Sequence, residues 1–489
     1  MDMNARLRGH ARGEAVGRAA RQLLWLDAAR SRPGGVDGEV ATERELLQAD
    51  EQRTRARRKP DPSGKRRLVL VWIWMPALLN GRDPEGRAPW LALARRRGVQ
   101  TWSGYELDRL GHLGYEGTLC PRMGATLTST PASDGYRMPG EFEPHRGCWM
   151  AWPERPDNWR LGAEPAQTAF AAVAEAINPS DPVTMGVSDA QFERARSILS
   201  PSIRVVELST DDAWIRDTGP TFLLDANGAR RGVDWHFNAW GGLDGGLYSD
   251  WERDERVARK VIEIESADRY RAPIVLEGGS IHVDGQGTVI STEQCLLNRN
   301  RNPTLSREQI EQVLLDYLGA EKVIWLGCGV YNDETDGHVD NLACFARPGT
   351  VLLTHTDDES DPQHAISENA LARLRATTDA HDRPIEVIQL PAPGPIAITA
   401  EEAAGVEHAP GTLPRRAGDR LPASYANFYL GSTRIVFPLL DSRYDDRAAE
   451  VLRGCFPDRE VVGVPAREIL LGGGNIHCIT QQVPALAAS

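Results

Sequence analysis

The chain has 489 residues, of which 41% are hydrophobic and 26% are charged. This length suits two or three ordinary domains or one large repeat-built domain, and the composition argues against a mostly disordered, fibrous or coiled-coil protein. The 46 glycines and 32 prolines predict many turns between short elements, which argues against a helical bundle.

Charge divides the chain into two parts. Residues 1–122 hold 23 Lys and Arg against 15 Asp and Glu, a net charge of +8, whereas residues 123–489 hold 33 against 54, a net charge of −21. We interpret residues 1–122, with 21 arginines and little apolar periodicity, as a poorly structured leader or an overlong reading frame starting truly at Met123, rather than a basic binding arm. We expect its removal to leave activity nearly unchanged. The acidic body, residues 123–489, disfavours a nucleic-acid partner and favours a small cationic ligand.

The cysteines and the apolar runs bear on the cellular compartment in which we expect the protein. The seven cysteines are scattered and form no CxxC pair, so we expect neither a disulfide framework nor a structural metal site. The longest apolar run, Leu68 to Leu79, is too short to cross a bilayer, and residues 1–30 lack the apolar core of a secretory signal. The sequence therefore predicts a cytoplasmic protein with no membrane partner, and it leaves a homo-oligomer open.

In chain order, short β-branched runs alternate with helical patterns. Ser188 with Gln191 and Ser306 with Gln309 have the spacing of capping boxes, which predicts a helix after each serine. This alternation predicts an α/β fold. The expected strands are Val183–Val187, Ile203–Leu208, Pro273–Leu276, Lys322–Leu326, Thr350–Leu353, Glu386–Leu390 and Thr433–Phe437.

One internal similarity suggests repeated modules. Leu276-Glu-Gly-Gly-Ser-Ile-His282 and Leu471-Gly-Gly-Gly-Asn-Ile-His477 agree at five of seven positions and lie 195 residues apart. This spacing is too wide for a solenoid and suits a fold built from a few copies of one module, each delivering a glycine-rich turn to the same end. Chance similarity between two glycine turns is the alternative.

Four polar clusters, at 211–220, 276–282, 334–341 and 471–478, end or interrupt the expected strands. In the third cluster His338 and Asp340 are two residues apart, so on an extended segment both side chains share a face. They form either an acid/base pair or a structural ion pair, depending on whether a nucleophile lies nearby. Cys478 follows a Gly-Gly-Gly-Asn turn that would leave it at an open strand end, whereas Cys295, before two leucines, is expected in the core. A papain-like protease has no use for so many carboxylates and lacks its local signature here.

Further motifs carry a family resemblance. The four clusters, together with Trp152-Pro-Glu-Arg-Pro-Asp-Asn-Trp-Arg160, Phe237-Asn-Ala-Trp-Gly-Gly242 and Ala423-Ser-Tyr-Ala-Asn-Phe-Tyr429, resemble the agmatine deiminases of the guanidine-modifying (pentein) superfamily. The resemblance runs from about Met138 to Ala485, within a catalytic domain of residues 123–489. It implies an α/β fold of five pseudo-symmetric modules arranged as a propeller, with the site at its centre.

The resemblance also implies a mechanism. Asp217 and Asp340 would hold the flat guanidinium of agmatine by charge-assisted hydrogen bonds. The Cys478 thiolate would attack its carbon, and His338 would first protonate the departing ammonia and then activate water, releasing N-carbamoylputrescine. This chemistry needs neither a metal nor an organic cofactor.

Other residues have more than one candidate role. Glu277 resembles the superfamily's acidic residue beside the site, or it caps its own glycine turn. Trp214 could line the substrate's chain, or it could be ordinary core. The candidates for binding the distal ammonium or for orienting His338 are Asp211, Asp212, Glu334 and Asp336.

Two alternatives stay open at this stage. A deiminase or amidinotransferase acting on arginine or another guanidine would share the same core residues, although arginine would need a cationic residue for its carboxylate, and the family pattern makes Arg216 structural. A polyamine-binding protein without catalysis is the other alternative, which the intact set of Cys478, His338, Asp217 and Asp340 disfavours.

Overall fold

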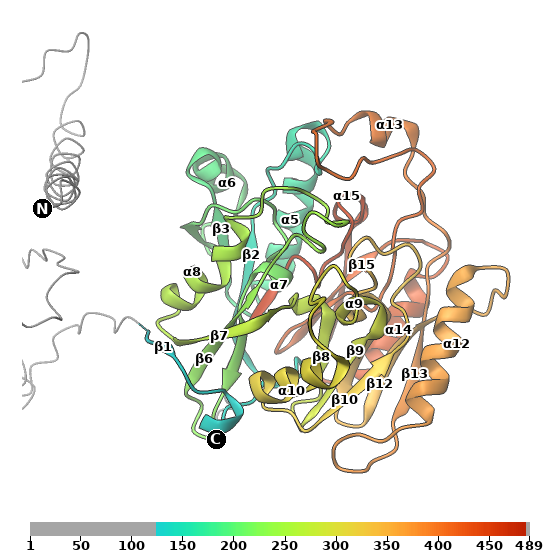
Figure 1. Ribbon diagram of the computed structural model, residues 1–489. Coiled ribbons are helices and arrows are strands. Elements are labelled where there is room, and N and C mark those ends of the chain that lie inside the picture. Colours follow the sequence, from blue (N-terminus) through green and yellow to red (C-terminus); the bar gives the residue numbers. More distant parts are fainter. Residues whose placement is uncertain (1–123, 486–489) are drawn as a thin grey trace, which may run out of the picture. The chain divides into compact units, whose positions relative to one another are not determined.

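The computed structural model describes residues 124–485. The expected leader, residues 1–122, lies outside the described residues, and the expectations about it stay predictions. The described chain alternates strands and helices from β1 (Thr126–Leu127) to β17 (Gln481–Pro484), which confirms the predicted α/β class (Figure 1).

The strands of the described chain form five sheets. Two sheets have four strands and three have three strands. The first is β17, β2 (His145–Ala151), β3 (Val183–Val187) and β4 (Arg204–Glu207), and the second is β1, β7 (Asp268–Val275), β6 (Arg230–His236) and β5 (Thr221–Leu224). The others are β8 (Ile281–Val283), β9 (Thr288–Thr292) and β10 (Lys322–Leu326); β11 (Ala343–Arg347), β12 (Thr350–His355) and β13 (Glu386–Pro391); and β14 (Tyr429–Leu430), β15 (Arg434–Leu439) and β16 (Glu460–Pro465).

All five sheets repeat one pattern. In each sheet one strand pairs antiparallel with a neighbour on one side and parallel with a neighbour on the other, as β9 does with β8 and β10. The central strands of the other sheets are β2, β6, β12 and β15. This repetition is what an architecture of five modules requires, while their arrangement as a propeller stays a prediction.

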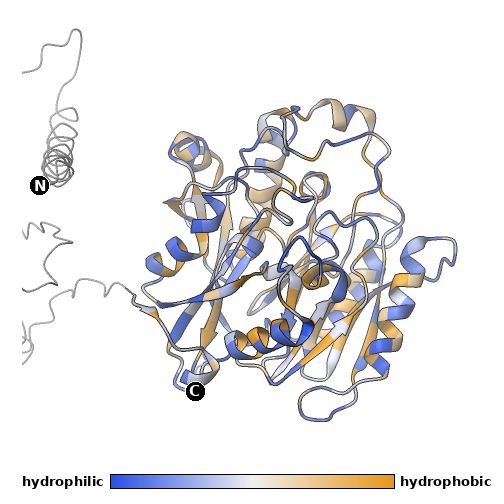
Figure 2. Ribbon diagram, viewed as in Figure 1, coloured by the Kyte–Doolittle hydropathy of each residue, from blue (hydrophilic) through white to orange (hydrophobic). Residues whose placement is uncertain are grey.

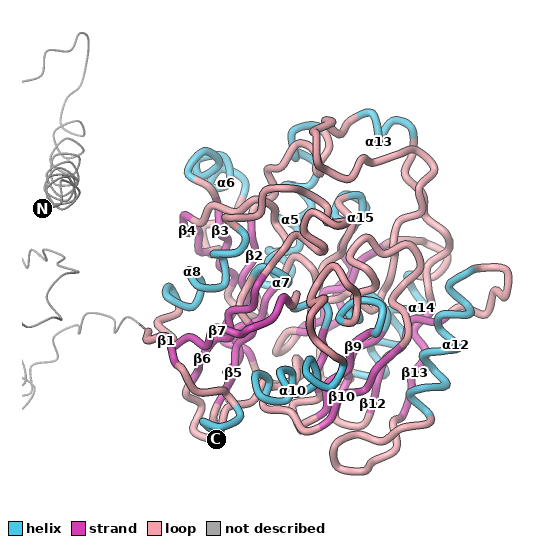
Figure 3. The backbone as a smooth tube through the Cα atoms, viewed as in Figure 1, coloured by secondary structure: helices cyan, strands magenta, loops and turns pink. Residues whose placement is uncertain are grey.

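A helix connects the two parallel strands of each module, because parallel neighbours need a long crossover. The five crossover helices are α5 (Glu164–Ile177), α8 (Val257–Ile264), α10 (Arg307–Leu318), α12 (Pro362–Arg375) and α14 (Asp445–Cys455). Shorter helices are α6 (Phe192–Ile198), α7 (Ile215–Thr218), α9 (Glu293–Leu296), α11 (Val339–Leu342), α13 (Ala400–Ala404) and α15 (Arg467–Leu471). Figure 3 shows α7 and α15 as short segments between loops. Single turns of 3₁₀ helix are η1 (Ala132–Asp134), η2 (Leu161–Ala163), η3 (Asp189–Gln191), η4 (Asp254–Arg256) and η5 (Gly278–Ser280).

Every predicted strand corresponds to an observed one, with ends that agree or differ by at most five residues. The capping box at Ser306 is confirmed, because its side chain accepts from the backbone N–H of Gln309 and the Gln309 side chain accepts in return. The capping box at Ser188 is wrong. A 3₁₀ turn follows Ser188, and its hydroxyl donates to Glu154 Oε2 (2.7 Å) instead of capping the turn.

The crossover helices bury one face against the sheets. On α5, Phe170, Val173 and Ile177 are fully buried and belong to the cluster that contains Met150 of β2 and Met185 of β3. Figure 2 shows the same division on α10 and α12, which carry hydrophobic and hydrophilic faces. Burial of this kind stabilises the fold by about 25 cal/mol for each Å² of apolar surface. Between residues 124 and 485, no helix is long and apolar enough to span a membrane.

Candidate active site

The polar clusters converge because each occupies the same place in its module, the segment before the antiparallel strand. Turns and short helices in these segments leave side chains free to meet at one point. The segments are α7 before β5 with Asp217, η5 before β8 with Glu277, α11 before β11 with His338 and Asp340, the loop before β14 with Asn427, and residues 472–480 before β17 with Cys478.

His338 lies between two carboxylates. Its Nδ1 is 3.8 Å from Asp217 Oδ2 and its Nε2 is 3.7 Å from Glu277 Oε2. Asp217 is held by the backbone N–H of Gly279 on Oδ1 (2.8 Å) and by Nε1 of Trp240 on Oδ2 (2.9 Å). All of these polar side chains are buried, so their charges interact strongly.

Gly279 explains why the second cluster needs glycine. A Cβ at this position would lie 2.6 Å from His338 Nδ1 and 2.9 Å from one oxygen each of Asp217 and Asp340. Any side chain would therefore occupy the space where these three groups meet. The turn is close-packed against the reactive groups rather than merely flexible.

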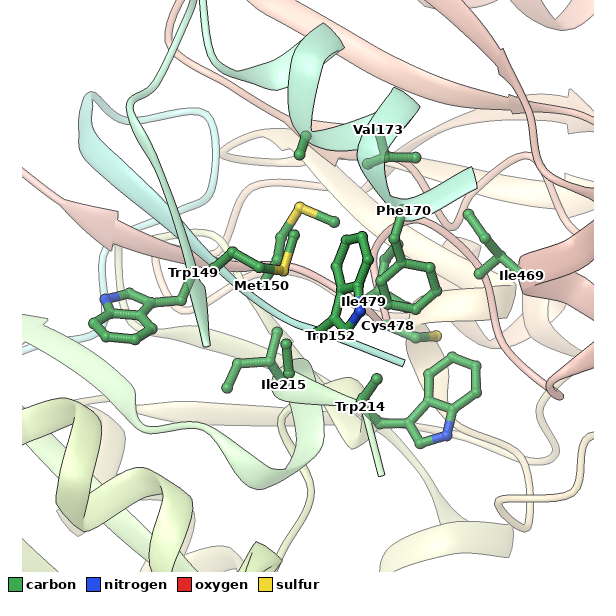
Figure 4. Close-up of a cluster of buried hydrophobic side chains, with 14 of the residues drawn as sticks. Trp149, Met150, Trp152, Phe170, Val173, Trp214, Ile215, Ile469, Cys478 and Ile479 are labelled. Carbon is green, nitrogen blue, oxygen red and sulfur yellow. The ribbon is translucent and has the colours of Figure 1, made fainter. Parts of the chain in front are cut away.

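Cys478 lies beside Asp340. Its Sγ is 3.5 Å from Asp340 Oδ2, and the amide of Asn427 contacts it twice, with Nδ2 donating to Sγ (3.1 Å). Figure 4 shows Cys478 among buried side chains, with Trp214 nearby. Gly474 approaches both residues, since a Cβ there would lie 3.1 Å from the sulfur and 2.6 Å from the Trp214 ring.

Glu277 does not cap its own turn. Its side chain makes no cap hydrogen bond, and Arg301 Nε donates to Oε1 (2.8 Å) in a pair that is completely buried. Cys295 is fully buried in the core, as expected, yet its Sγ also lies 4.0 Å from Glu277 Oε2. Glu277 thus links Arg301 to His338.

The charges of the site perturb each other's protonation. Burial alone would lower the pKa of His338, but Asp217, with Cys295 and Glu277, raises it well above its ordinary value. Burial raises the pKa of Asp217 to about 6, an effect that His338 opposes and Asp340 and Glu277 reinforce. Burial, together with the charges of Asp340 and Asp217, raises the pKa of the Cys478 thiol well above its usual range. The site therefore combines an imidazolium with a thiol.

The expectation that His338 and Asp340 lie on one extended segment is wrong. His338 is extended (φ −53°, ψ 140°), but α11 begins at the next residue, so Asp340 lies in the first turn of a helix. Both side chains still reach the site, because one precedes the helix and the other projects from its first turn.

A second acid, Glu334, lies on the far side of the glycine turn. A Cβ at Gly473 would be 2.6 Å from Glu334 Oε2, and Arg415 forms a close ion pair with Oε1. Arg415 also donates to the carbonyl of Gly472 (2.6 Å). Trp214 is 4% exposed and packs on Trp159 with ring centroids 5.1 Å apart, so it is both core and a wall beside the turn.

Asp211 is used elsewhere in the fold. Its Oδ2 accepts hydrogen bonds from the backbone N–H groups of Arg253 (2.8 Å) and Asp254 (3.3 Å), which fixes the start of η4. Asp212 accepts from Trp159, Trp214 and Asn158. These two acids support the walls of the site rather than face its reactive groups.

Two groups of three donors within the described residues have the spacing of metal ligands, with atoms within 4.8 Å of one another. They are Glu277 with Cys295 and His338, and Glu141 with His282 and His477. In each group an arginine already holds the carboxylate, Arg301 on Glu277 and Arg216 on Glu141. A divalent cation would have to displace that charge, which disfavours a metal at either place.

Several supporting residues were not predicted from the sequence. Trp240, Asn427, Arg301 and Arg415 each contact a predicted site residue through a side chain. Trp240 and Asn427 lie in motifs that carry the family resemblance, and this position was a usable signal. Arg301 and Arg415 lie in no such motif.

The sequence of this chain is similar to those of known deiminases. The family description "Porphyromonas-type peptidyl-arginine deiminase" matches residues 137–484. The agmatine deiminase of Stutzerimonas stutzeri is 59% identical over 362 residues, which cover 74% of this chain and 98% of the relative. The agmatine deiminase of Pseudomonas aeruginosa is 58% identical over 360 residues, which cover 73% of this chain and 98% of the relative.

Solved structures agree. The agmatine deiminase of Enterococcus faecalis superposes with a TM-score of 0.73 at 49% identity, covering 74% of this chain and all of that one. A substrate-bound agmatine deiminase of C. jejuni superposes with a TM-score of 0.61 at 25% identity, and the match covers 72% of this chain and 97% of that one. The chain therefore belongs to the Porphyromonas-type peptidyl-arginine deiminase family, with the fold of the agmatine deiminases it resembles.

Proposed function

We propose that residues 123–489 hydrolyse agmatine to N-carbamoylputrescine and ammonia through a covalent amidino intermediate on Cys478. The observation that carries the proposal is the contact of Cys478 Sγ with Asp340 (3.5 Å) in a site where His338 lies 3.8 Å from Asp217. A nucleophile, an acid and two guanidinium-binding carboxylates thus meet in one buried place. Relatives named agmatine deiminase at 58–59% identity support the substrate.

The two carboxylates bind the guanidinium. A guanidinium is a flat cation with several N–H donors, and carboxylates on two of its edges fix its central carbon. Among the described residues Asp340 Oδ1 has no hydrogen-bond partner although it is buried, which leaves it for the substrate. An unpaired buried acceptor is costly, so the substrate N–H groups relieve that cost.

The cation then activates the nucleophile. Asp217 and Asp340 raise the pKa of the Cys478 thiol, and a guanidinium between them cancels that effect. The thiol proton leaves the site as the substrate binds, and the amide of Asn427 donates to the resulting thiolate. The thiolate attacks the guanidinium carbon, forming an S–C bond.

His338 transfers the protons. As an imidazolium it gives a proton to the departing nitrogen, the C–N bond breaks, and ammonia leaves. The neutral imidazole next takes a proton from water, whose oxygen attacks the same carbon. The S–C bond breaks, the hydroxyl of the intermediate gives its proton to the leaving Cys478 sulfur and becomes the ureido carbonyl, and the product departs, which restores the thiol. None of these steps needs a cofactor.

Glu334 takes the distal ammonium, and Trp214 lines the methylene chain. Glu334 Oε2 is buried and has no partner among the described residues, and a Cβ at Gly473, in the turn that holds Cys478, would lie 2.6 Å from it. Arg415 is a cation near this end, but Glu334 neutralises it, so it offers little to the carboxylate of arginine. We therefore expect agmatine to be preferred over arginine by about a thousandfold in kcat/KM. A cytoplasmic location and a small cationic partner rather than nucleic acid complete the proposal.

The test is to incubate the purified chain with agmatine and with arginine and to measure ammonia and the ureido product. We expect both products from agmatine, in equal amounts. Comparable kcat/KM for arginine would favour an arginine deiminase. Amidine transfer to an added amine without ammonia would favour an amidinotransferase, and binding without turnover a polyamine-binding protein.

A further inference from the structure

The two histidines that end the repeated motifs meet at one buried carboxylate. His282 and His477 stack with ring centroids 6.3 Å apart and an interplanar angle of 28°. His477 Nε2 lies 2.9 Å from Glu141 Oε1, and His282 Nε2 lies 3.7 Å from Glu141 Oε2. The internal similarity therefore places equivalent side chains side by side, directly behind the proposed active site.

His477 alone of the two reaches the guanidinium-binding carboxylate. Its Nδ1 is 2.8 Å from Asp340 Oδ2, while its Nε2 contacts Glu141. An ionised carboxylate only accepts hydrogen bonds, so a ring that bridges two of them carries a proton on each nitrogen. His477 is 3% exposed, so the positive charge of its ring is poorly screened by solvent.

The charges behind Asp340 alternate in sign. Arg216 Nη1 donates to Glu141 Oε1 (2.9 Å), so the sequence of contacts runs Asp340, His477, Glu141, Arg216. Four buried charges that alternate in this way compensate one another. His477 occupies Oδ2 of Asp340 and leaves Oδ1 without a partner among the described residues.

We propose that His477 is a positioning residue that, as an imidazolium, keeps Asp340 ionised and turns its free oxygen toward the substrate guanidinium. The inference rests on the proposed function for the identity of that substrate. A Cβ at Gly279 would lie 2.9 Å from Asp217 Oδ1 and 2.9 Å from Asp340 Oδ2, so these two buried carboxylates meet at one site and compete for a proton. The imidazolium of His477 behind Asp340 keeps both carboxylates ionised and able to bind the guanidinium.

The directions of the pKa shifts agree with this role. Burial would raise the pKa of Asp340, but its hydrogen bond from His477 and the charges of His477, His338 and Arg216 lower it. Burial and Arg216 would lower the pKa of His477, but Glu141 and Asp340 raise it. The ionisable groups that face this pair from the packed segments are Asp217, His338, Asp333, Cys344, Cys478, Glu141, Arg216 and His282.

The first test is the pH profile of kcat/KM for agmatine in the His477→Gln variant of the full chain. Without the cation the pair formed by Asp217 and Asp340 takes up a proton at higher pH, so the acidic limb should move to higher pH by about one pH unit and KM should rise about tenfold, while kcat at alkaline pH falls less. His282→Gln is the matched comparison, because it alters the equivalent ring without touching Asp340, and its acidic limb should stay in place. An unmoved limb in His477→Gln would overturn the proposal.

A second measurement needs neither activity nor folding of that variant. In ¹⁵N-histidine-labelled protein that carries His338→Gln and His282→Gln, one imidazole should keep both N–H protons above neutral pH, and it should lose one of them when Glu141→Gln is added. Absence of such a signal would refute the charge on His477. If the signal is present but the parent protein does not act on agmatine, the proposed function fails and the charged array stands.

Discussion

The two copies of the glycine motif, residues 276–282 and 471–477, have similar sequences but contribute different groups to the site. After Gly278 and Gly279 the chain enters β8 at once, so His282 and Val283 lie in a buried strand. After Gly473 and Gly474 the chain makes a further turn, and β17 does not begin until Gln481. The extra turn keeps the residue after the second histidine out of the sheet.

Because of this extra turn, the two copies contribute different reactive groups to the site. The first copy contributes a carboxylate before its glycines, Glu277, whereas the second contributes a thiol after its histidine, Cys478. Gly279 and Gly474, which are equivalent, both approach reactive groups closely, one at His338 and the other at the sulfur. A repeated scaffold therefore supplies two close-packed walls, and single substitutions at its ends decide which wall bears the acid and which bears the nucleophile.

The largest effect should come from the residue that distinguishes the second copy. Cys478→Ser should lower agmatine turnover by at least about a thousandfold, since an alcohol is far less ionised than a thiol and is a poor nucleophile here. Steady-state ammonia release measures this. Cys328→Ser, at an exposed cysteine, is the control and should turn over like the parent. Near-parental turnover by Cys478→Ser would refute the nucleophile.

The close-packed wall of the first copy is tested by Gly279→Ala. The added Cβ would lie 2.6 Å from His338 Nδ1, so kcat/KM for agmatine should fall at least about a hundredfold as the reacting groups are displaced. Gly454→Ala in α14 is the matched control, because a Cβ there meets no atom within 4 Å. An active Gly279→Ala variant would show that the site has more room than the structure contains.

The carboxylate of the first copy should set the protonation of His338. In Glu277→Gln the pKa of His338 falls, because Glu277 helps to raise it, so the alkaline limb of kcat/KM should move to lower pH. A tenfold to hundredfold loss of kcat/KM near neutral pH should accompany it, on the order of general acid catalysis. Asp336→Asn is the comparison, since Asp336 also contacts Arg301 (2.8 Å) but forms no hydrogen bond or ion pair with His338 in the described chain, and the alkaline limb of this variant should not move. Equal shifts in both variants would contradict a direct role for Glu277.

The smallest effect concerns the turn itself. Ser280 Oγ donates to the carbonyl of Glu277 (2.6 Å), and Ser280 is fully buried. Ser280→Ala should lower the free energy of unfolding by about 1 kcal/mol. Denaturant unfolding measures this, with the exposed Ser197→Ala as a control expected within about 0.5 kcal/mol of the parent. No loss of stability would mean that the turn does not depend on this bond.

Local sequence patterns predicted most of the fold. The strands Val183–Val187 and Lys322–Leu326 are observed with the predicted ends, since buried β-branched runs have few alternatives. Ser188 failed because its hydroxyl bonds Glu154, 34 residues away in the chain, and a local pattern cannot weigh such a contact. Residues that match a motif locally are still free to bind a distant partner.

The site could be predicted only in part for the same reason. Cys478, His338, Asp217, Asp340 and Glu277 lie in the four polar clusters that end or interrupt the expected strands, and the structure brings them together. Their partners come from segments that are far apart, with His477 bonding Asp340 across 137 residues and Arg301 bonding Glu277 from a stretch without any motif. Asp211 shares a cluster with Asp217, yet its carboxylate binds backbone amides, and its type alone could not reveal that.

The central claim is that Cys478 forms a covalent bond with the guanidinium carbon during turnover. Acid-quenching the parent enzyme while it acts on agmatine, followed by digestion and mass spectrometry, should yield the Cys478 peptide heavier by agmatine less one ammonia. The peptide with Cys295, the other buried cysteine near His338, should be unmodified. An adduct on Cys295, or rapid turnover with no adduct on any cysteine across repeated quench times, would contradict the account.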